Sequence, residues 1–420
     1  MATDVKSLAE KYLNNTDFEQ WDWQNFISFF EQMFQQEGFR EENNDGQQHI
    51  LLLRLDAMGD MVLSTGFVRE VRRNYPTAYI TLLVSPAIYP LVCDCPYVNR
   101  ILVLNVSLFY SEKKDFFSEL LQLCVEYLWQ ERYDFSICPQ WGDDKTIPEA
   151  VAYLSGARQR FGYSCNTLSA YGFPLLHDEM EKALMTDVFI SPRDIIHEAE
   201  RTLYLLKAIG MKVEADNMEL WYGKKELTIA KKLLSSVATA GRTLIAVGLG
   251  AGTGNRKYPV KQYAEVLKIL YRKYTCCFVV LGGKSEQEDA EMLRALLPSK
   301  TIVCNLTGRT SILETAAVLS KTDIYVGNDT GVMHMAAAVG LPVVMVSREE
   351  DDFCGNLAGV FSENQRFAPW QANHVICCPD GRTGDCVGWM GYGGCKEQYS
   401  HCICNVKPDE IVKGVEILLQ

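Results

Sequence analysis

The sequence predicts an α/β fold made of two doubly wound parallel-sheet domains, and three observations lead to this expectation. From His49 onward, short and fully apolar runs alternate with amphipathic helical stretches, as in a parallel sheet that helices cover on both faces. This alternation occurs as two series separated by a less regular segment. The chain has 420 residues, which is too long for one ordinary core.

Residues 1–48 are predicted to form a helical N-terminal extension that ends in a polar linker. Phe26, Phe29, Phe30 and Phe34 recur at three- and four-residue steps, which makes one face of the helix apolar. That face could dock on its own domain, form an oligomer contact or touch a membrane surface, and the sequence leaves all three open.

The first α/β series belongs to a predicted domain over residues 49–235, which includes a connecting segment from about residue 140. We expect four buried strands there, over 49–55, 78–84, 100–105 and 133–139. Helices are expected between them, with a further helix over 194–210 in the connecting segment.

The second series defines a predicted domain over residues 236–405. Its expected strands are 243–250, 276–283, 301–308, 323–331 and 341–347. A Cys-rich insertion over 377–404 reads as irregular chain, and residues 406–420 as a closing helix with Pro408 at its start. Two such domains would form a cleft at their sheet ends, where doubly wound folds bind ligands.

Composition narrows the class of protein. Apolar residues make up 48% and charged residues 22% of the chain, which is typical of a globular protein and excludes wholesale disorder. No apolar run reaches the roughly 18 to 20 residues of a spanning helix, and the first residues lack a signal-peptide pattern. We therefore expect a cytoplasmic protein whose fifteen cysteines are mostly reduced.

The net charge of −12 argues against nucleic acid as a partner, because phosphate binding needs concentrated positive charge. Arg69, Arg72 and Arg73 in "VREVRRNYP" are the best candidates for a local basic patch. A solvated helix face is the alternative interpretation of the same three residues.

Glycine-rich loops after two of the second-series strands could bind an anion. In "GLGAGTGNRKYP" the glycines let backbone N–H groups approach a phosphate and Lys257 can add a charge, although a plain tight turn explains the same residues. In "VVLGGKSEQE", Glu286 either stabilises the first turn of a helix or binds a ribose or base edge.

Two aspartate-containing turns also follow strands and open helices. In "VGNDTGVMHMAAAVGLP", Asp329 and Thr330 end a strand, Gly331 opens a helix and His334 lies on its first turn; a cap and a packed histidine would explain them equally well. In "LRLDAMGDMVL", Asp60 is either a helix cap or a carboxylate placed for chemistry.

Together these loops resemble the ADP-heptose heptosyltransferases, glycosyltransferase family 9. The resemblance covers residues 49 to 347 and returns near the C-terminus. The blocks that carry it are "ILLLRLDAMGDMVL", "GAGTGNRKYPVKQYAEV", "LGGKSEQE", "TDIYVGNDTGVMHMAAAVGLPVV" and the closing "HCICNVKPDEIV".

This resemblance implies a GT-B enzyme with two Rossmann-like domains that transfers a sugar from a nucleotide diphosphate with inversion and without a metal. It implies that the C-terminal domain holds the donor and that Asp60 acts as general base. Lys257, Gly252 and Thr253 would meet the diphosphate and Glu286 the nucleoside. The residues implied to bind the phosphates and the sugar are Asp329, Thr330, Gly331, Val332 and His334.

These implied roles agree with the chemistry of glycosyl transfer. Negative charge develops on the departing phosphate, so anion-stabilising groups are needed there, and a base must accept the proton of the attacking hydroxyl. Lys257 and the helix that starts at Gly331 could stabilise the phosphate, and Asp60 could act as the base.

The C-terminal cysteines leave two interpretations open. Cys378, Cys386, Cys395 and Cys402 are candidate ligands for a structural zinc or iron ion, since four thiolates can form a tetrahedral site. Paired C-x-x-C ligands are absent from this segment. The alternative to a metal site is therefore that these cysteines are reduced or occasionally oxidised thiols. The resemblance implies that catalysis itself requires no cofactor.

The favoured function is transfer of a heptose or related sugar from an ADP-sugar to a lipopolysaccharide core acceptor. This places the protein in the cytoplasm, with peripheral contact to the inner face of the membrane as an option. A protein acceptor, as in the autotransporter heptosyltransferases, is the first alternative. A non-catalytic nucleotide-sugar binding protein is the second.

Overall fold

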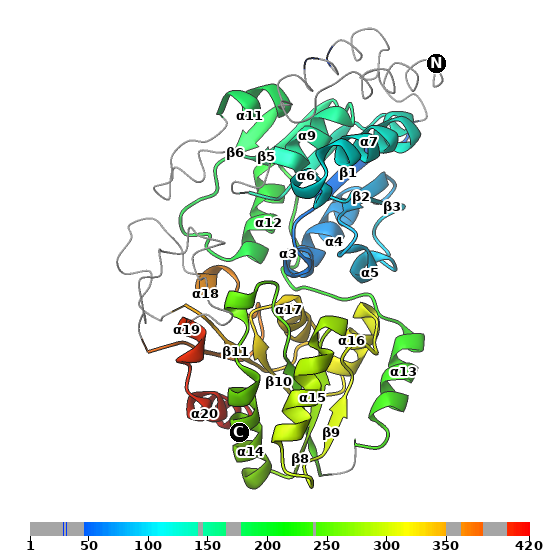
Figure 1. Cartoon of the computed structure of the whole chain (residues 1–420). Helices are drawn as coiled ribbons and strands as arrows, with labels where there is room; N and C mark the ends of the chain where they lie inside the picture. Colours follow the sequence, from blue (N-terminus) through cyan, green and yellow to red (C-terminus); the bar gives the residue numbers. More distant parts are fainter. Residues whose placement is uncertain are drawn as a thin grey trace. The chain divides into compact units, whose positions relative to one another are not determined.

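The computed structural model describes residues 46–141, 146–164, 178–237, 241–349, 363–380 and 401–420, together with residues 28 and 31. Its residues group into two units (Figure 1): unit 1 comprises Met1–Ile195 and Ala199–Asp216, and unit 2 comprises Ile196–Glu198 and Asn217–Gln420. The predicted helix over 1–48 and its phenylalanine stripe lie outside the described residues.

Unit 1 contains a six-stranded parallel sheet in the order β3-β2-β1-β4-β5-β6. The central strand β1 is buried along its whole length, which explains why its sequence is continuously apolar up to Arg54. The strands are β1 His49–Arg54, β2 Tyr79–Val84, β3 Arg100–Val103, β4 Phe135–Cys138, β5 Gln159–Tyr163 and β6 Asp187–Phe189.

The helices of unit 1 connect these parallel strands. They are α3 Met58–Leu63, α4 Thr65–Asn74, α5 Tyr89–Val92, α6 Leu108–Ser111, α7 Lys113–Leu123, α8 Trp129–Glu131, α9 Thr146–Leu154, α11 Asp178–Leu184 and α12 Glu198–Ala208. A π-helical segment, Cys124–Leu128, joins α7 to α8. One of the helical stretches expected between strands therefore consists of three consecutive segments, from Lys113 to Glu131.

Unit 2 repeats the same topology, with a parallel sheet in the order β12-β11-β10-β7-β8-β9. The first strand of the unit, β7, lies between the second and the fourth, as β1 does in unit 1. The strands are β7 Thr243–Gly248, β8 Cys276–Leu281, β9 Val303–Asn305, β10 Ile324–Asn328, β11 Val343–Val346 and β12 His374–Cys377.

Helices also connect the strands of unit 2 (Figure 1). The closing helix α20 packs against α14 and against strands β10, β11 and β12, so the end of the chain completes the core of this unit. The helices are α13 Lys224–Leu234, α14 Val260–Lys273, α15 Gln287–Leu296, α16 Ile312–Leu319, α17 Gly331–Ala338, α18 Glu363–Arg366, α19 His401–Cys404 and α20 Pro408–Leu418.

The two predicted sheets are confirmed, and the structure adds three strands that the sequence analysis did not expect. Strands β5 and β6 lie in the segment predicted to be less regular, and β12 follows the last predicted strand of unit 2. These strands have three to five residues, and none of them is buried along its whole length. They therefore lack the continuous apolar run that identified the other strands.

The arginines of α4 differ in their surroundings: Arg69 is buried and Arg72 is half-buried, whereas Arg73 lies on the solvated face of the helix. Arg69 is 3% exposed and pairs with the fully buried Glu70, and Arg73 also contacts Glu70 at 2.6 Å. Arg72 donates to the carbonyl groups of Tyr97, Tyr75, Pro76 and Ala78. Arg69 and Arg72 thus connect α4 to neighbouring loops, whereas the Arg73 contact lies within the helix.

Among the residues that the structure describes, no helix is long and apolar enough to cross a membrane.

Candidate functional site

The unit 2 sheet creates a ligand-binding position between β7 and β10. These strands are paired in parallel, and the chain continues from β7 towards one edge of the sheet and from β10 towards the other. In doubly wound sheets, ligands bind outside the carboxyl ends of the strands at such a reversal of strand order. The loops that start at Leu249 and Asp329 are the two loops of this position.

A buried asparagine holds these two loops together. Asn328, the last residue of β10, is fully buried, and its amide group donates to the carbonyl oxygens of Leu249 at 3.1 Å and Gly250 at 3.0 Å. Its Oδ1 accepts from the Tyr258 N–H at 3.1 Å and from the Tyr263 hydroxyl at 2.9 Å. Both ends of the side chain are thereby satisfied by the segment that follows β7.

The sequence analysis assigned no role to Asn328, which connects the two loops of the candidate site. The signal available was an amide side chain at the end of a strand, immediately before the Asp-Thr-Gly turn. Burial raises the pKa of Tyr263 well above its usual value, so its hydroxyl remains a proton donor to Asn328.

Two glycines of these strands are required by close packing. A Cβ atom on Gly248 would lie 2.0 Å from the Tyr325 hydroxyl oxygen, and one on Gly327 would lie 2.4 Å from the same atom. The buried Tyr325 ring therefore lies against the ends of both central strands. Because of this contact, neither Gly248 nor Gly327 could be replaced by a residue with a side chain without moving the Tyr325 ring.

Three predicted residues follow directly after Asn328. Thr330 is the N-cap of α17, Gly331 is its first residue, and Asp329 lies just before them. Asp329, Thr330, Gly331 and Val332 are all partly exposed. The structure therefore brings the start of α17, with its unpaired backbone N–H groups, to the surface at the sheet edge.

His334 is a buried and neutral residue of this helix. Its side chain is 4% exposed, and Nε2 lies 3.9 Å from Asp329 Oδ1. Burial, with smaller contributions from the nearby His197 and Arg256, lowers the pKa of His334 to about 3. Its Nδ1 atom has no hydrogen-bond partner among the described residues.

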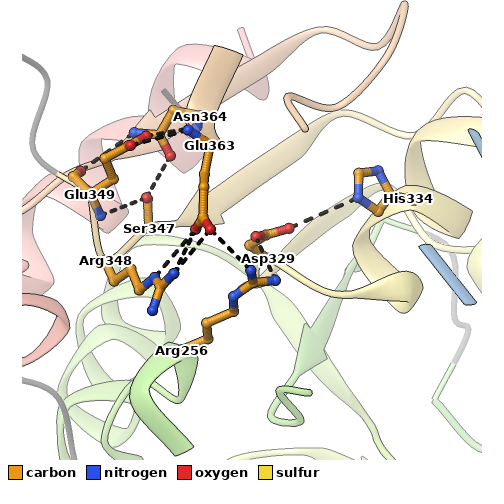
Figure 2. Close-up of polar contacts among 8 residues, drawn as sticks. All are labelled: Arg256, Asp329, His334, Ser347, Arg348, Glu349, Glu363 and Asn364. Carbon is orange, nitrogen blue, oxygen red and sulfur yellow. Dashed lines mark hydrogen bonds and ion pairs between the residues drawn. The ribbon is translucent and has the colours of Figure 1, made fainter. Parts of the chain in front are cut away.

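Arg256 connects the Asp329 turn to a second carboxylate (Figure 2). One guanidinium nitrogen lies 3.4 Å from Asp329 Oδ2 and another lies 3.3 Å from Glu363 Oε1. Arg348, which follows β11, binds both oxygens of the same Glu363 carboxylate at 2.9 and 3.0 Å. Burial alone would raise the pKa of Glu363, but Arg256, Arg348 and the nearby Arg366 outweigh this effect, so the pKa is lowered.

The segment that carries Glu363 is itself anchored. Glu349 accepts the backbone N–H groups of Glu363 and Asn364 at 3.1 and 2.8 Å, and Ser347 donates to Asn364 (Figure 2). Further along, His197 Nε2 donates to the Ala368 carbonyl at 2.9 Å.

Lys257 and Glu286 lie at the same edge of the sheet but have protein partners. Lys257 forms an ion pair with Asp289 in the first turn of α15. The Glu286 carboxylate accepts the Gly283 N–H at 2.7 Å and the Ser285 hydroxyl at 2.7 Å, so it stabilises the short helical turn Lys284–Glu286, and its binding to a nucleoside stays a prediction. Gly252 and Thr253 are exposed, as a phosphate-binding loop requires.

In unit 1, at the corresponding position after β1, two aspartates form ion pairs with a buried arginine. Arg54 is 2% exposed and lies 3.0 Å from Asp56 and 3.3 Å from Asp60. The N-cap of α3 is Ala57, and Asp60 is the third residue of the helix. The cap interpretation of Asp60 is therefore wrong, because the helix starts three residues earlier than a cap at this position would require.

The structure describes two of the four predicted metal ligands. Cys378 accepts a hydrogen bond from the Asn364 amide at 3.4 Å, and Cys402 lies in α19; Cys386 and Cys395 lie outside the described residues. Within the described part of the chain, no three His, Cys, Asp or Glu side chains are grouped to hold a metal. Burial raises the pKa of the neighbouring Cys377 to about 12, which keeps it a thiol.

Comparisons with known proteins give a consistent result. Residues 182–383 match the family model described as glycosyltransferase family 9 (heptosyltransferase). The lipooligosaccharide heptosyltransferase 2 of Haemophilus ducreyi is 23% identical over 382 residues, which cover 88% of this chain and 99% of that protein. The lipopolysaccharide heptosyltransferase 2 of Escherichia coli is 26% identical over 314 residues, which cover 70% of this chain and 81% of that protein.

Solved structures agree on the fold. A glycosyl transferase family 9 protein from Veillonella parvula has a TM-score of 0.69 at 18% identity and covers 89% of this chain and 97% of its own. The ADP-heptose heptosyltransferase II of Escherichia coli has a TM-score of 0.62 at 20% identity and covers 89% and 98%. These neighbours show a two-domain GT-B architecture for the chain.

The Asn328 amide generates the first prediction. Asn328→Asp replaces the donor group by an oxygen that faces two carbonyl oxygens, so we expect the free energy of unfolding to fall by about 3 kcal/mol or more. Tyr263→Phe is the matched control, because it removes one of the four hydrogen bonds and should cost about 1 kcal/mol. Urea denaturation measures both, and equal losses would contradict the assigned role of the amide.

The two buried histidines predict how stability depends on pH. Burial also lowers the pKa of His197, to about 4, so the unfolded chain binds protons at His197 and His334 below about pH 6.5 while the folded chain does not. Stability is therefore highest above that pH and falls as the pH decreases, by up to about 1.4 kcal/mol per pH unit for each group.

Urea denaturation between pH 7 and 5 tests this for His334. His334→Gln should show a smaller loss of stability on acidification than the wild type, because the glutamine side chain does not titrate. Equal pH dependence in the wild type and His334→Gln would rule out a neutral buried His334.

Proposed function

We propose that the chain, whose residues 182–383 match the model of glycosyltransferase family 9, is a member of that family and transfers a heptose or a related sugar from an ADP-sugar to a lipopolysaccharide core acceptor. Membership of the family makes the chain a glycosyltransferase. The named relatives are heptosyltransferases of lipopolysaccharide or lipooligosaccharide, and one structural neighbour is described as an ADP-heptose enzyme. These names support the choice of donor and acceptor.

The observation that carries the proposal is the convergence of loops at one edge of the unit 2 sheet. Asn328 bonds the loop after β7 to the end of β10, and a Cβ on Gly250 would lie 3.4 Å from the Glu286 carboxyl group. Loops following three different strands therefore meet where a nucleotide binds in a doubly wound domain. This supports a donor site built entirely from residues of unit 2.

Within that site we assign roles by chemistry. The exposed backbone of Gly252 and Thr253 and the start of α17 donate N–H groups to the diphosphate, where charge grows as the sugar departs. Lys257 adds a positive charge, Glu286 binds the nucleoside, and the Asp329 turn contacts phosphate and sugar. His334 is neutral, so it can act there as a hydrogen-bond donor or acceptor but not as a cation.

Asp60 of unit 1 is the proposed general base. Its contact with Arg54 favours the ionised carboxylate, which is the form that accepts a proton from an acceptor hydroxyl. It is 18% exposed on its side chain, so a substrate can reach it. We place the reaction at the cytoplasmic face of the membrane, because nucleotide-sugar donor and lipid acceptor would meet there.

The identity of the substrates is tested by product release. Incubation with ADP-, UDP- and GDP-sugars and a lipopolysaccharide core acceptor should release ADP from ADP-heptose and transfer the sugar to the lipid. A serine-rich protein acceptor is assayed in parallel. Release of UDP or GDP in place of ADP would overturn the donor assignment, and sugar found on the protein rather than the lipid would overturn the acceptor.

The role of Asp60 is tested by an isosteric pair of variants. Asp60→Asn keeps the shape but removes the proton acceptor, so the transfer rate should fall by about 100- to 10,000-fold while donor binding persists. Asp56→Asn changes the other aspartate on Arg54 and should reduce the rate far less. Initial rates and calorimetric donor binding measure the two effects, and an active Asp60→Asn enzyme would refute a base at this position.

A further inference from the structure

We infer that the outward face of helix α13 binds the surface of an anionic lipid bilayer. Lys224, Lys225, Lys231 and Lys232 form this face, which is called the α13 basic face below. The inference rests on the proposed function in one respect, because a lipid-linked acceptor would lie in such a bilayer. None of the four lysines belongs to the candidate site.

The four lysines lie on one side of the helix. Residues 224, 225, 228, 231 and 232 recur at steps of three and four, so they share one arc of α13, and all of them are exposed. The structure describes every residue of α13, and this arc carries no acidic side chain. The two lysine pairs are about 10 Å apart along the helix axis, close to a Debye length at physiological salt, so their fields add at a facing surface.

The opposite side of α13 is fixed against unit 2. Ala230 and Leu234 are buried, and α13 packs against α16. The Leu233 carbonyl also accepts a hydrogen bond from the Cys304 thiol of strand β9 at 3.7 Å. These contacts hold the lysines towards solvent, on a helix that lies at the outer edge of unit 2 (Figure 1).

The lysines of this face have few acidic partners. Lys225 lies 3.8 Å from Glu226, whose carboxylate also accepts the Gly223 N–H at 2.9 Å. The other three side chains form no ion pair with a described residue, whereas two lysines of α14 are paired with glutamates. The α13 basic face is therefore a locally positive surface on a chain whose net charge is −12.

Two of the lysines occupy positions that are unfavourable for the helix itself. Lys224 and Lys225 are the first two residues of α13, where the helix dipole favours acidic side chains and disfavours cations. Glu226 is the one residue of this first turn that complements the dipole. Helix stability therefore does not explain two lysines at this end, whereas an anionic partner does.

An anionic bilayer fits this face better than a nucleic acid does. Clusters of four or more basic residues on an amphipathic helix are attracted to anionic headgroups through their summed charge. The face has no arginine, the side chain that recognises phosphates by paired hydrogen bonds, and no aromatic ring on which a base could stack. It offers point charges spread over one helix, which suits a surface of many headgroups.

The experiment is co-sedimentation of the full-length chain with phosphatidylcholine vesicles that contain or lack phosphatidylglycerol. The wild type should bind the vesicles with phosphatidylglycerol, and added salt should weaken the binding. Replacing all four lysines by glutamine should weaken it by about 100-fold or more, since each lysine near an anionic surface contributes roughly fivefold. Lys224→Gln with Lys225→Gln should weaken it by about 20-fold without lowering the melting temperature.

The matched control changes the net charge equally at another place in unit 2. It combines Lys261→Gln, Lys268→Gln and Lys273→Gln on α14 with Lys413→Gln on α20. This variant should bind the vesicles within about threefold of the wild type. Equal loss of binding in the two quadruple variants would overturn the inference, because net charge rather than α13 would then control the binding.

Two further results would overturn the inference. One is a wild-type chain that does not bind vesicles with phosphatidylglycerol, and the other is tighter binding of the α13 basic face to single-stranded RNA than to these vesicles. ADP binding and transfer to a detergent-solubilised acceptor should be unchanged in the α13 variant. Failure of these two assays in the wild type would refute the proposed function and leave the vesicle result standing.

Discussion

The Asn328 side-chain amide is the interaction on which the unit 2 site depends. It bonds to two backbone carbonyl groups, one backbone N–H and one hydroxyl, all from the segment that follows β7. Without it, a long loop would leave a buried strand with its polar groups unsatisfied. Arg256 and Lys257 lie directly before the fastened Tyr258, and Asp329 directly follows Asn328. One amide therefore determines how these three charged groups are placed relative to one another.

Charged groups of both units are held as pairs in this structure. Arg54 binds two aspartates, Lys257 binds Asp289, and Arg256 binds Asp329 and Glu363. Pairing lowers the cost of keeping charges partly buried, and it holds long side chains in one conformation.

Much of the fold could be predicted because its central strands have an unambiguous pattern. The runs at β1, β7 and β8 are buried on both faces and read as continuous apolar segments. Strands β6 and β12 include exposed residues, so local pattern could not identify them. The loops of the candidate site were found because each follows such a strand. The partners of their side chains were not, since ion pairs such as Arg256 with Glu363 join residues 107 positions apart.

The sequence by itself determined the α/β class, the two parallel-sheet domains and the loops that carry the candidate site, because burial on two faces imposes a local pattern on strands and helices. Only the tertiary structure decided what the side chains contact. It placed Ala57 rather than Asp60 at the helix cap, buried Arg69 against Glu70, and made Asn328 the link between two loops. Such contacts depend on distance in space, and spacing along the chain does not encode it.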